Sequence, residues 1–239
     1  MKTNIDTYIH FAVLDKEDKV ADCFVGLRRY PSTKFILFIT SDLFHDLKRS
    51  VDNTLESLKI LIPDLKVEIH NTKLKDYWEI FFKTQEICEK IANNSKNVHF
   101  YANISTKNRI AALAIRDALA AVGRSAICYY RIRGKSEEER TEILEVPVIP
   151  FAREINRSIP ILKSLYKRGG KASSIEDIAK DIGEKLSRSK SFGSRAKLVE
   201  YYIRKLEIYA VVRTIPGKKR EVILTGTLPS ITQAMSRAW

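Results

Sequence analysis

Residues 98–115, VHFYANISTKNRIAALAI, contain the transition that decides the fold of this chain. The stretch begins with an apolar run rich in β-branched and aromatic residues, which predicts a buried strand over 98–104. A crowded polar loop follows, and an alanine-rich helix is expected over 107–122. A strand, a polar loop and a helix in this order are typical of a βα unit in a parallel sheet.

The same alternation runs through the first 132 residues. Strand patterns occupy 7–14, 34–40, 65–71, 98–104 and 126–132, and helical patterns lie between them at 20–30, 43–61, 77–92 and 107–122. Repeated βα units predict a mostly parallel sheet with helices on both faces. We therefore expect an α/β fold, a Rossmann-like three-layer sandwich, whose ligands lie beyond the carboxyl ends of the strands where the strand order reverses.

Two loops are expected at that edge, one after the first strand and one after the fourth. Their candidate ligand-binding residues are Leu14, Asp15 and Lys16 in the first loop, and Asn103, Ser105, Thr106, Lys107, Asn108 and Arg109 in the second. Ser105 or Thr106 is expected to cap the following helix. Lys107 and Arg109 have the wrong sign for the helix dipole but the right sign for a bound anion, which favours a phosphate-bearing ligand. The alternative is an ordinary cap with solvated lysine and arginine.

Several enzyme classes lack their sequence signatures. The turn after the first strand, residues 14–18, has carboxylates where a dinucleotide-binding G-x-G-x-x-G would lie, and no P-loop motif occurs. No Ser-His-Asp or Cys-His arrangement has local support either. We therefore assign no catalytic residue and expect a protein that is not an enzyme and needs no cofactor.

Metal binding and membrane association also find no support. The cysteines (Cys23, Cys88 and Cys128) are widely spaced, which predicts reduced thiols and a cytoplasmic protein. The histidines (His10, His45, His70 and His99) lack metal-ligand spacing and are expected in strands or on the surface. The sequence has no apolar run near 20 residues and no signal peptide.

Charge divides the chain into two unlike parts. The formal net charge is +13, but residues 1–150 hold 23 Lys and Arg against 21 Asp and Glu, whereas residues 151–239 hold 19 against 8. An excess of +11 in the last third favours a module that binds a polyanion. The alternative is a basic surface that serves solubility alone.

The basic third has its own order of elements. Helices are expected over 153–166, 175–182 and 194–206, and strands over 208–214 and 221–225. Pro160 is expected to kink or restart the first of these helices. Three helices followed by a hairpin predict a winged helix-turn-helix. We expect a ligand-sensing domain at 1–133, a linker or edge strand at 134–152, with the domain boundary near Phe151, and a DNA-binding domain at 153–239.

In a winged helix the third helix enters the major groove, and the hairpin tip lies against phosphate or the minor groove. The expected phosphate contacts are Arg188, Lys190, Arg195, Arg204, Lys218, Lys219 and Arg220, and the expected base contacts are Ser194, Lys197 and Tyr201, with Lys205 on the same side of the helix. Affinity should then fall steeply with salt. The alternative is a winged helix that contacts a protein.

The two parts together resemble the archaeal CRISPR-associated transcription regulators that carry a CARF domain. Residues 98–115 are similar to the CARF segment after the fourth strand, with Asn103, Ser105 and Arg109 at its Asn-x-[Ser/Thr] and basic positions. Thr106 and Lys107 stand where that family has glycines. The motif covers about ten residues, although the architecture covers most of the chain. The resemblance implies a homodimer, a cyclic oligoadenylate ligand such as cyclic tetra-adenylate, promoter DNA as partner and a role in antiviral defence.

We therefore expect a homodimeric, ligand-responsive, DNA-binding transcription regulator. One alternative is a ring nuclease of the CARF type that cleaves its cyclic oligoadenylate, with Ser105, Lys107 or Arg109 stabilising charge. Another is an adaptor whose winged helix binds RNA or protein. An effector other than a cyclic oligoadenylate also remains open, because related regulators of uncharacterised ligand share the Asn-x-Ser-Thr pattern.

Overall fold

The chain forms two compact units, residues 1–150 and residues 151–239, which we call unit 1 and unit 2. The structure is a computed structural model and describes residues 6–95, 97–132, 142–148, 153–182, 191–208, 211–216 and 220–225. Each unit has its own sheet and its own buried apolar residues.

Unit 1 is built on a six-stranded sheet in the order β3-β2-β1-β4-β5-β6. The strands are β1 (Thr7–Val13), β2 (Lys34–Ile39), β3 (Lys66–Asn71), β4 (Val98–Asn103), β5 (Ala126–Ile132) and β6 (Glu142–Pro147). The first five are parallel, and β6 pairs antiparallel with β5. This order reverses between β1 and β4, as in a Rossmann-like sheet. The predicted α/β fold with a mostly parallel sheet is confirmed.

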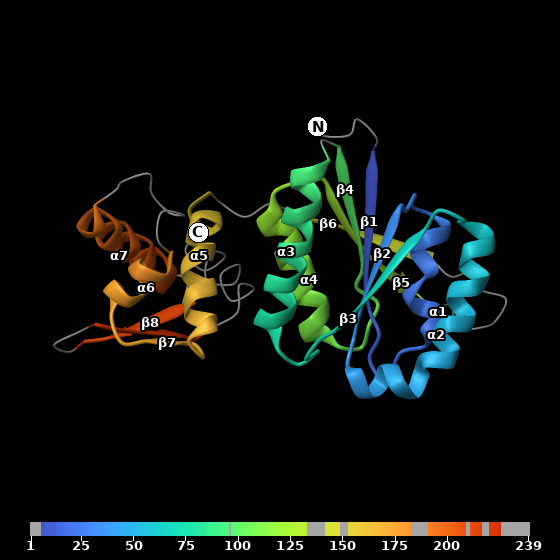
Figure 1. The fold of residues 1–239 in the computed structure, drawn as a ribbon, viewed down its shortest axis with the longest axis horizontal. Helices are drawn as coiled ribbons and strands as arrows, with labels where there is room; N and C mark the ends of the chain where they lie inside the picture. The colour runs from blue at the N-terminus through green and yellow to red at the C-terminus, as the bar shows by residue number, and fades with distance from the viewer. Residues whose placement is uncertain are drawn as a thin grey trace. The chain divides into compact units, whose positions relative to one another are not determined.

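Helices cover both faces of this sheet (Figure 1). One face carries α1 (Val20–Cys23), the 3₁₀-helix η1 (Val25–Arg28) and α2 (Ser41–Leu61), and the other carries α3 (Tyr77–Asn94) and α4 (Arg109–Val122). Because both faces are covered, the central strands are apolar throughout: residues 35–39 of β2 are all fully buried. The three layers follow directly from the apolar strands and the amphipathic helices of the sequence.

The segment predicted as one helix over 20–30 is instead divided into α1 and η1. The chain passes so close to the sheet here that a Cβ on Gly26 would lie 1.9 Å from the hydroxyl oxygen of Tyr129. Phe24 and Leu27 still pack against the sheet, as helical spacing predicts. The close approach at Gly26 therefore replaces a regular helix with two short turns.

Of the region predicted as a linker or edge strand, the structure describes residues 142–148. Most of these form β6, which pairs with β5 from Ile127↔Pro147 to Ile132↔Glu142. Arg29 also donates to the Glu145 carboxylate at 3.1 Å. The edge-strand alternative is therefore correct, and β6 is part of the sheet of unit 1.

The described residues of unit 2 form three helices and a small antiparallel sheet. Its elements are α5 (Arg153–Lys167), β7 (Lys171–Ala172), α6 (Ile175–Ile182), α7 (Phe192–Ile208), β8 (Val212–Ile215) and β9 (Glu221–Leu224), with the sheet order β7-β9-β8. The apolar stripe of α7 is buried, as its spacing predicts. The predicted cap of α6 is confirmed, because the Asp177 N–H donates to Ser174 Oγ at 3.1 Å.

One expectation for unit 2 was wrong, and another is narrowed. The strand expected over 208–214 starts later, because α7 continues to Ile208 and β8 begins at Val212. The Glu207 carboxylate accepts from the backbone N–H of Thr214 at 3.0 Å and from its hydroxyl, which joins the end of α7 to β8. Pro160 was expected to kink or restart the first helix; α5 continues through it to Lys167, so the helix does not restart there.

Candidate functional site

The loops that follow β1 and β4 are bonded to each other at the point where the strand order reverses. The Asp18 carboxylate, in the loop after β1, accepts from the Thr106 hydroxyl at 2.5 Å and from the Lys107 N–H at 3.0 Å. The side chain of Asn108 donates to Asp15 at 2.9 Å. The structure thus brings together the two loops that the sequence singled out.

The cap of α4 differs from the expectation of Ser105 or Thr106. Asn108 is the N-cap residue, and its side-chain oxygen accepts from the Ala111 N–H at 3.0 Å. Thr106 lies two residues earlier, where its hydroxyl oxygen accepts from the Asn108 N–H at 3.1 Å. The helix begins at Arg109, so Arg109 lies in its first turn and Lys107 precedes the cap.

Asn103 and Ser105 hold the loop in shape rather than pointing into solvent. The buried Asn103 amide donates to the carbonyl oxygens of Asp22 and Cys23 at 2.8 and 3.2 Å, and its oxygen accepts from the Ser105 N–H. The Ser105 hydroxyl oxygen accepts from the Arg131 backbone N–H at 2.8 Å. Leu14 is fully buried in the core, so its inclusion among the ligand-binding residues is corrected.

Charges of both signs surround the joined loops. Lys16, Lys107 and Arg109 are exposed, and Lys107 Nζ lies 3.5 Å from the Glu17 carboxylate. Arg131, on β5, is paired with Asp22. The sequence did not lead us to expect that Asp18, Asp22 and Arg131 belong to this region. The run of carboxylates in residues 15–18 was the signal that could have indicated it.

The cavity enclosed between the two loops is small. Its volume is about 20 Å³, and it is lined by Val13, Asp18, Asp22, Cys23, Asn103, Ser105 and Thr106. That volume holds about one water molecule, so a larger ligand has to contact the exposed outer side of the loops. The positive side chains on that outer side are those of Lys16, Lys107 and Arg109.

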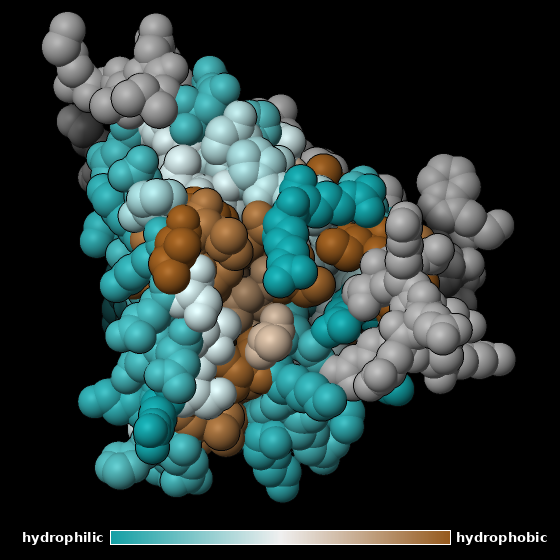
Figure 2. Space-filling view, turned by 90° about the vertical axis from the view of Figure 1, so that its right-hand side faces the viewer, coloured by the Kyte–Doolittle hydropathy of each residue, from teal (hydrophilic) through white to brown (hydrophobic). Residues whose placement is uncertain are grey.

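A larger cavity in unit 1 lies between α1 and α2. It has a volume of about 360 Å³ and is lined largely by apolar side chains, among them Phe24, Val25 and Leu58. Figure 2 shows apolar residues gathered in a furrow on this side of the unit. Ile60 and Leu61, at the end of α2, are 82% and 67% exposed. None of the sequence-predicted ligand residues lines this cavity.

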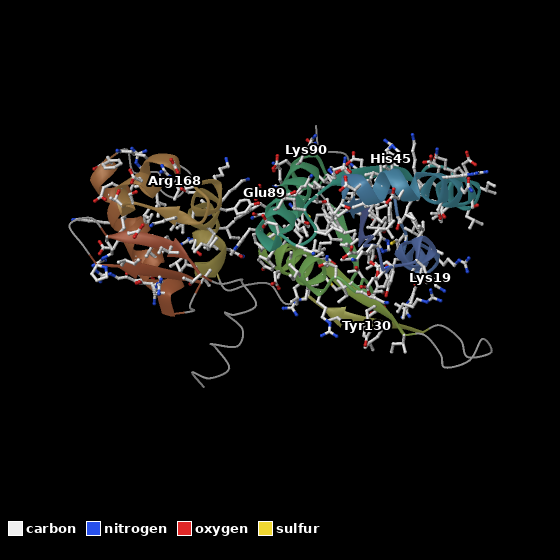
Figure 3. The ribbon with its side chains drawn as sticks, turned by 90° about the horizontal axis from the view of Figure 1, so that it is seen from below. Lys19, His45, Glu89, Lys90, Tyr130 and Arg168 are labelled. Atoms are coloured by element: carbon white, nitrogen blue, oxygen red, sulfur yellow. The ribbon has the colours of Figure 1, made fainter. Side chains whose placement is uncertain are left out.

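The histidines lie where the sequence placed them. His10, His70 and His99 are in β1, β3 and β4, and His45 is on the exposed side of α2 (Figure 3). His10 is fully buried beside the Tyr129 hydroxyl, and burial lowers its pKa to about 3. Among the described residues, no three His, Cys, Asp or Glu side chains form a metal site, and no helix is long and apolar enough to cross a bilayer.

The outward side of α7 in unit 2 is mostly basic. Ser194, Lys197, Tyr201 and Arg204 are exposed there, and the Lys205 ammonium lies 5.7 Å from the centre of the Tyr201 ring. The Arg195 guanidinium lies 6.0 Å from the centre of the Phe192 ring. Of the other residues predicted to contact DNA, Arg220 is described and exposed. Arg188, Lys190, Lys218 and Lys219 lie outside the described residues.

One carboxylate interrupts this basic surface and holds two of its arginines. The same Glu200 oxygen accepts from Arg204 at 2.8 Å and from Arg220 at 3.0 Å. These hydrogen bonds, that of Arg204 above all, lower the pKa of Glu200. Glu200, Lys197 and Arg220 also line a groove of about 730 Å³ at α6 and α7, together with Ser174, Ile175, Glu176, Asp177, Lys180, Phe192 and Ala196.

Known proteins give partial structural overlaps only. No protein family and no curated protein matches this chain. Csm6 of Enterococcus italicus, bound to cyclic hexa-2'-fluoro-hexa-dAMP, overlaps 87% of this chain and 57% of its own, with a TM-score of 0.46 and 9% identity. Can2 of Sulfobacillus thermosulfidooxidans, in complex with cyclic tetra-adenylate, overlaps 85% and 66%, with a TM-score of 0.37 and 15% identity.

Protein VC1899 of Vibrio cholerae overlaps 95% of this chain and 64% of its own, with a TM-score of 0.39 and 11% identity. The chain thus spans less than two thirds of the length of each of these three proteins. At these TM-scores, the ligands in those structures are not transferred to this protein.

Proposed function

We propose that this protein is a homodimeric DNA-binding transcription regulator whose unit 1 senses a phosphate-bearing effector. The observation that carries the proposal is the exposed basic side of α7, beside a hairpin strand that begins after Arg220. An exposed basic helix side of this kind suits the major groove of duplex DNA. A regulator also needs a part that responds to a signal, and unit 1 supplies it.

The winged helix assignment rests on the order of elements in unit 2. A helix, a short strand, two helices and two more strands follow one another as α5-β7-α6-α7-β8-β9. Strand β9 lies between β7 and β8 in the sheet. In this assignment α7 is the reading helix, and the β8–β9 hairpin is the wing that lies against the DNA backbone.

For unit 1 we propose a cyclic oligoadenylate as effector, with cyclic tetra-adenylate as the first candidate. The choice of ring comes from the resemblance of residues 98–115 to the CARF segment. The exposed cations Lys16, Lys107 and Arg109 around the joined loops support an anionic ligand. Because the enclosed cavity is small, the phosphates of the ring would contact these side chains from the solvent side.

A dimer would join two such sites. Ile110 and Leu113, next to the loop on α4, are 46% and 38% exposed, although both are large and apolar. Burying them against a second copy would bring the two sets of loops close together. An effector bound to both copies would then change the relative placement of the two reading helices, and with it the spacing of DNA half-sites that they can span.

A mobility shift on the duplex upstream of the protein's own gene tests the proposal. We expect a shift that weakens steeply between two salt concentrations and changes when cyclic tetra-adenylate is added. Absence of any shift at micromolar protein would contradict DNA binding. If calorimetry detects no heat of binding for cyclic tetra-adenylate, the proposed effector is wrong. If the protein converts labelled cyclic tetra-adenylate into a linear product, it is an enzyme.

A further inference from the structure

Glu200 stands out on the surface that we assign to DNA, because a carboxylate is repelled by phosphates. The helix α7 has two carboxylates, and the other one, Glu207, is used within the fold by Thr214. Glu200 instead lies among cations and is half-buried between Arg204 and Arg220. A surface that binds phosphates alone would gain affinity if this residue were neutral.

One of the two ion pairs lies within α7, and the other joins α7 to the residue before β9. Arg204 lies one turn further along α7, whereas Arg220 precedes β9 at the base of the proposed wing. Each arginine uses one guanidinium nitrogen on the Glu200 oxygen. To reach a phosphate freely, either arginine has to give up this bond or bring the carboxylate toward the phosphate with it. Glu200 therefore opposes phosphate contacts by both arginines.

Base pairs can offset this cost only where they offer a donor. In the major groove, cytosine presents its N4 amino group and adenine its N6 amino group, and a carboxylate accepts from such groups. On other sequences no base donor compensates for the repulsion between the Glu200 carboxylate and the DNA phosphates. A carboxylate in this position thus penalises binding to arbitrary DNA more than binding to a sequence with an amino group opposite it.

We propose that Glu200 is the specificity-determining residue of the DNA-binding surface: it restrains Arg204 and Arg220 on arbitrary DNA and accepts a base amino group at the cognate site. This inference rests on the proposed DNA binding of unit 2. It assigns to Glu200 a role distinct from that of the cations expected to contact phosphates, such as Arg195, which supply affinity for any sequence.

The experiment compares the full-length protein with Glu200→Gln, which keeps an oxygen acceptor but loses the charge. Glu207→Gln is the matched control, because it makes the same change of charge on the same helix, away from the arginines. Each protein is titrated against an arbitrary 30-base-pair duplex at several salt concentrations. Each is also used to select binders from a pool of duplexes with a randomised core.

We expect Glu200→Gln to bind the arbitrary duplex about 10-fold more tightly at low salt, with a salt slope steeper by about 1 to 2, since up to two more arginines reach phosphates. The preference of the selected pool for cytosine or adenine at one position of each half-site should weaken, because the Gln amide can also donate to the acceptors of guanine and thymine. Glu207→Gln should change neither. Circular dichroism checks that both variants fold.

Equal behaviour of the two variants in both assays would overturn the inference, since net charge alone would then explain the result. Weaker binding of Glu200→Gln to every duplex would also overturn it, because Glu200 would then only support the fold of the surface. If the unchanged protein selects no sequence and binds no duplex, DNA binding itself is wrong. A further variant, Arg220→Met, should weaken binding to the selected sequence more than binding to the arbitrary duplex, because Glu200 already restrains Arg220 on the arbitrary duplex.

Discussion

The Thr106 hydroxyl donates to the Asp18 carboxylate at 2.5 Å, across 88 residues of sequence. This contact joins the loop after β1 to the loop after β4, the two strands at which the order of the sheet reverses. It shows that the Thr106 hydroxyl, a donor of the second loop, is already used by a carboxylate of the first. The outer, positively charged side of the loops is therefore the part left for a ligand.

The Asp18–Thr106 contact should contribute measurably to the stability of unit 1. Thr106→Val keeps the shape of the side chain but removes the hydroxyl, which donates to Asp18 and accepts from the Asn108 N–H, and we expect a loss of about 1.5 kcal/mol because the acceptor of the donated bond is charged. The measurement is urea unfolding followed by Trp78 fluorescence in a Trp239→Phe background. Thr54→Val is the control: its hydroxyl donates to Ser50 within α2, so a loss below about 0.5 kcal/mol is expected. Equal losses would show that the contact between the loops has no special weight.

Gly26 should not tolerate a methyl group. The added Cβ would lie 1.9 Å from the hydroxyl oxygen and 2.1 Å from the adjoining ring carbon of Tyr129, which is fully buried and cannot move aside. We expect Gly26→Ala to destabilise unit 1 by about 3 kcal/mol in the same unfolding assay. Gly193→Ala in α7 has its nearest contact at 3.9 Å, so it should leave stability unchanged or raise it slightly. A stable Gly26→Ala protein would contradict the close approach.

Burial of His10 predicts a dependence of stability on pH. Its pKa is lowered from 6.5 to about 3 by burial, so the unfolded state binds a proton more readily between these values. The contribution of His10 to the free energy of unfolding is therefore fully present above pH 6.5. It decreases as the pH falls toward 3, by up to about 4 kcal/mol. His10→Gln should show a smaller decrease over that range in urea unfolding. The two proteins would have parallel pH profiles if His10 were accessible to solvent.

Arg195 should supply affinity without sequence preference. Its side chain is partly exposed in the first turn of α7, so Arg195→Ala should weaken binding to an arbitrary duplex and reduce the salt slope by about 0.9, the effect of one phosphate contact. Lys48→Ala, an exposed position on α2 of unit 1, is the control for net charge. If the salt slope fell equally in both variants, the DNA would bind at a surface other than that of α7.

Local patterns in the sequence were sufficient for the architecture of unit 1. Apolar runs with strand propensity predicted five parallel strands, and β5 has the predicted limits, because burial on both faces leaves a continuous apolar stretch. The predicted limits of α1 and β8 were wrong because these elements contact residues outside their own stretches of sequence. Gly26 lies against Tyr129, and Thr214 bonds to Glu207, and neither partner is a neighbour in sequence.

The candidate sites, too, were partly predictable from the sequence and partly decided by the tertiary structure. By itself the sequence determined which loops follow the apolar strands and which side of α7 is charged, since period and composition are local properties. Only the tertiary structure decided that Asn108 caps α4, that Asp18 accepts from Thr106 and that Glu200 holds Arg220. Periodicity tells which side of an element is buried. The partner that a polar side chain meets depends on how distant segments pack, and this only the folded chain determines.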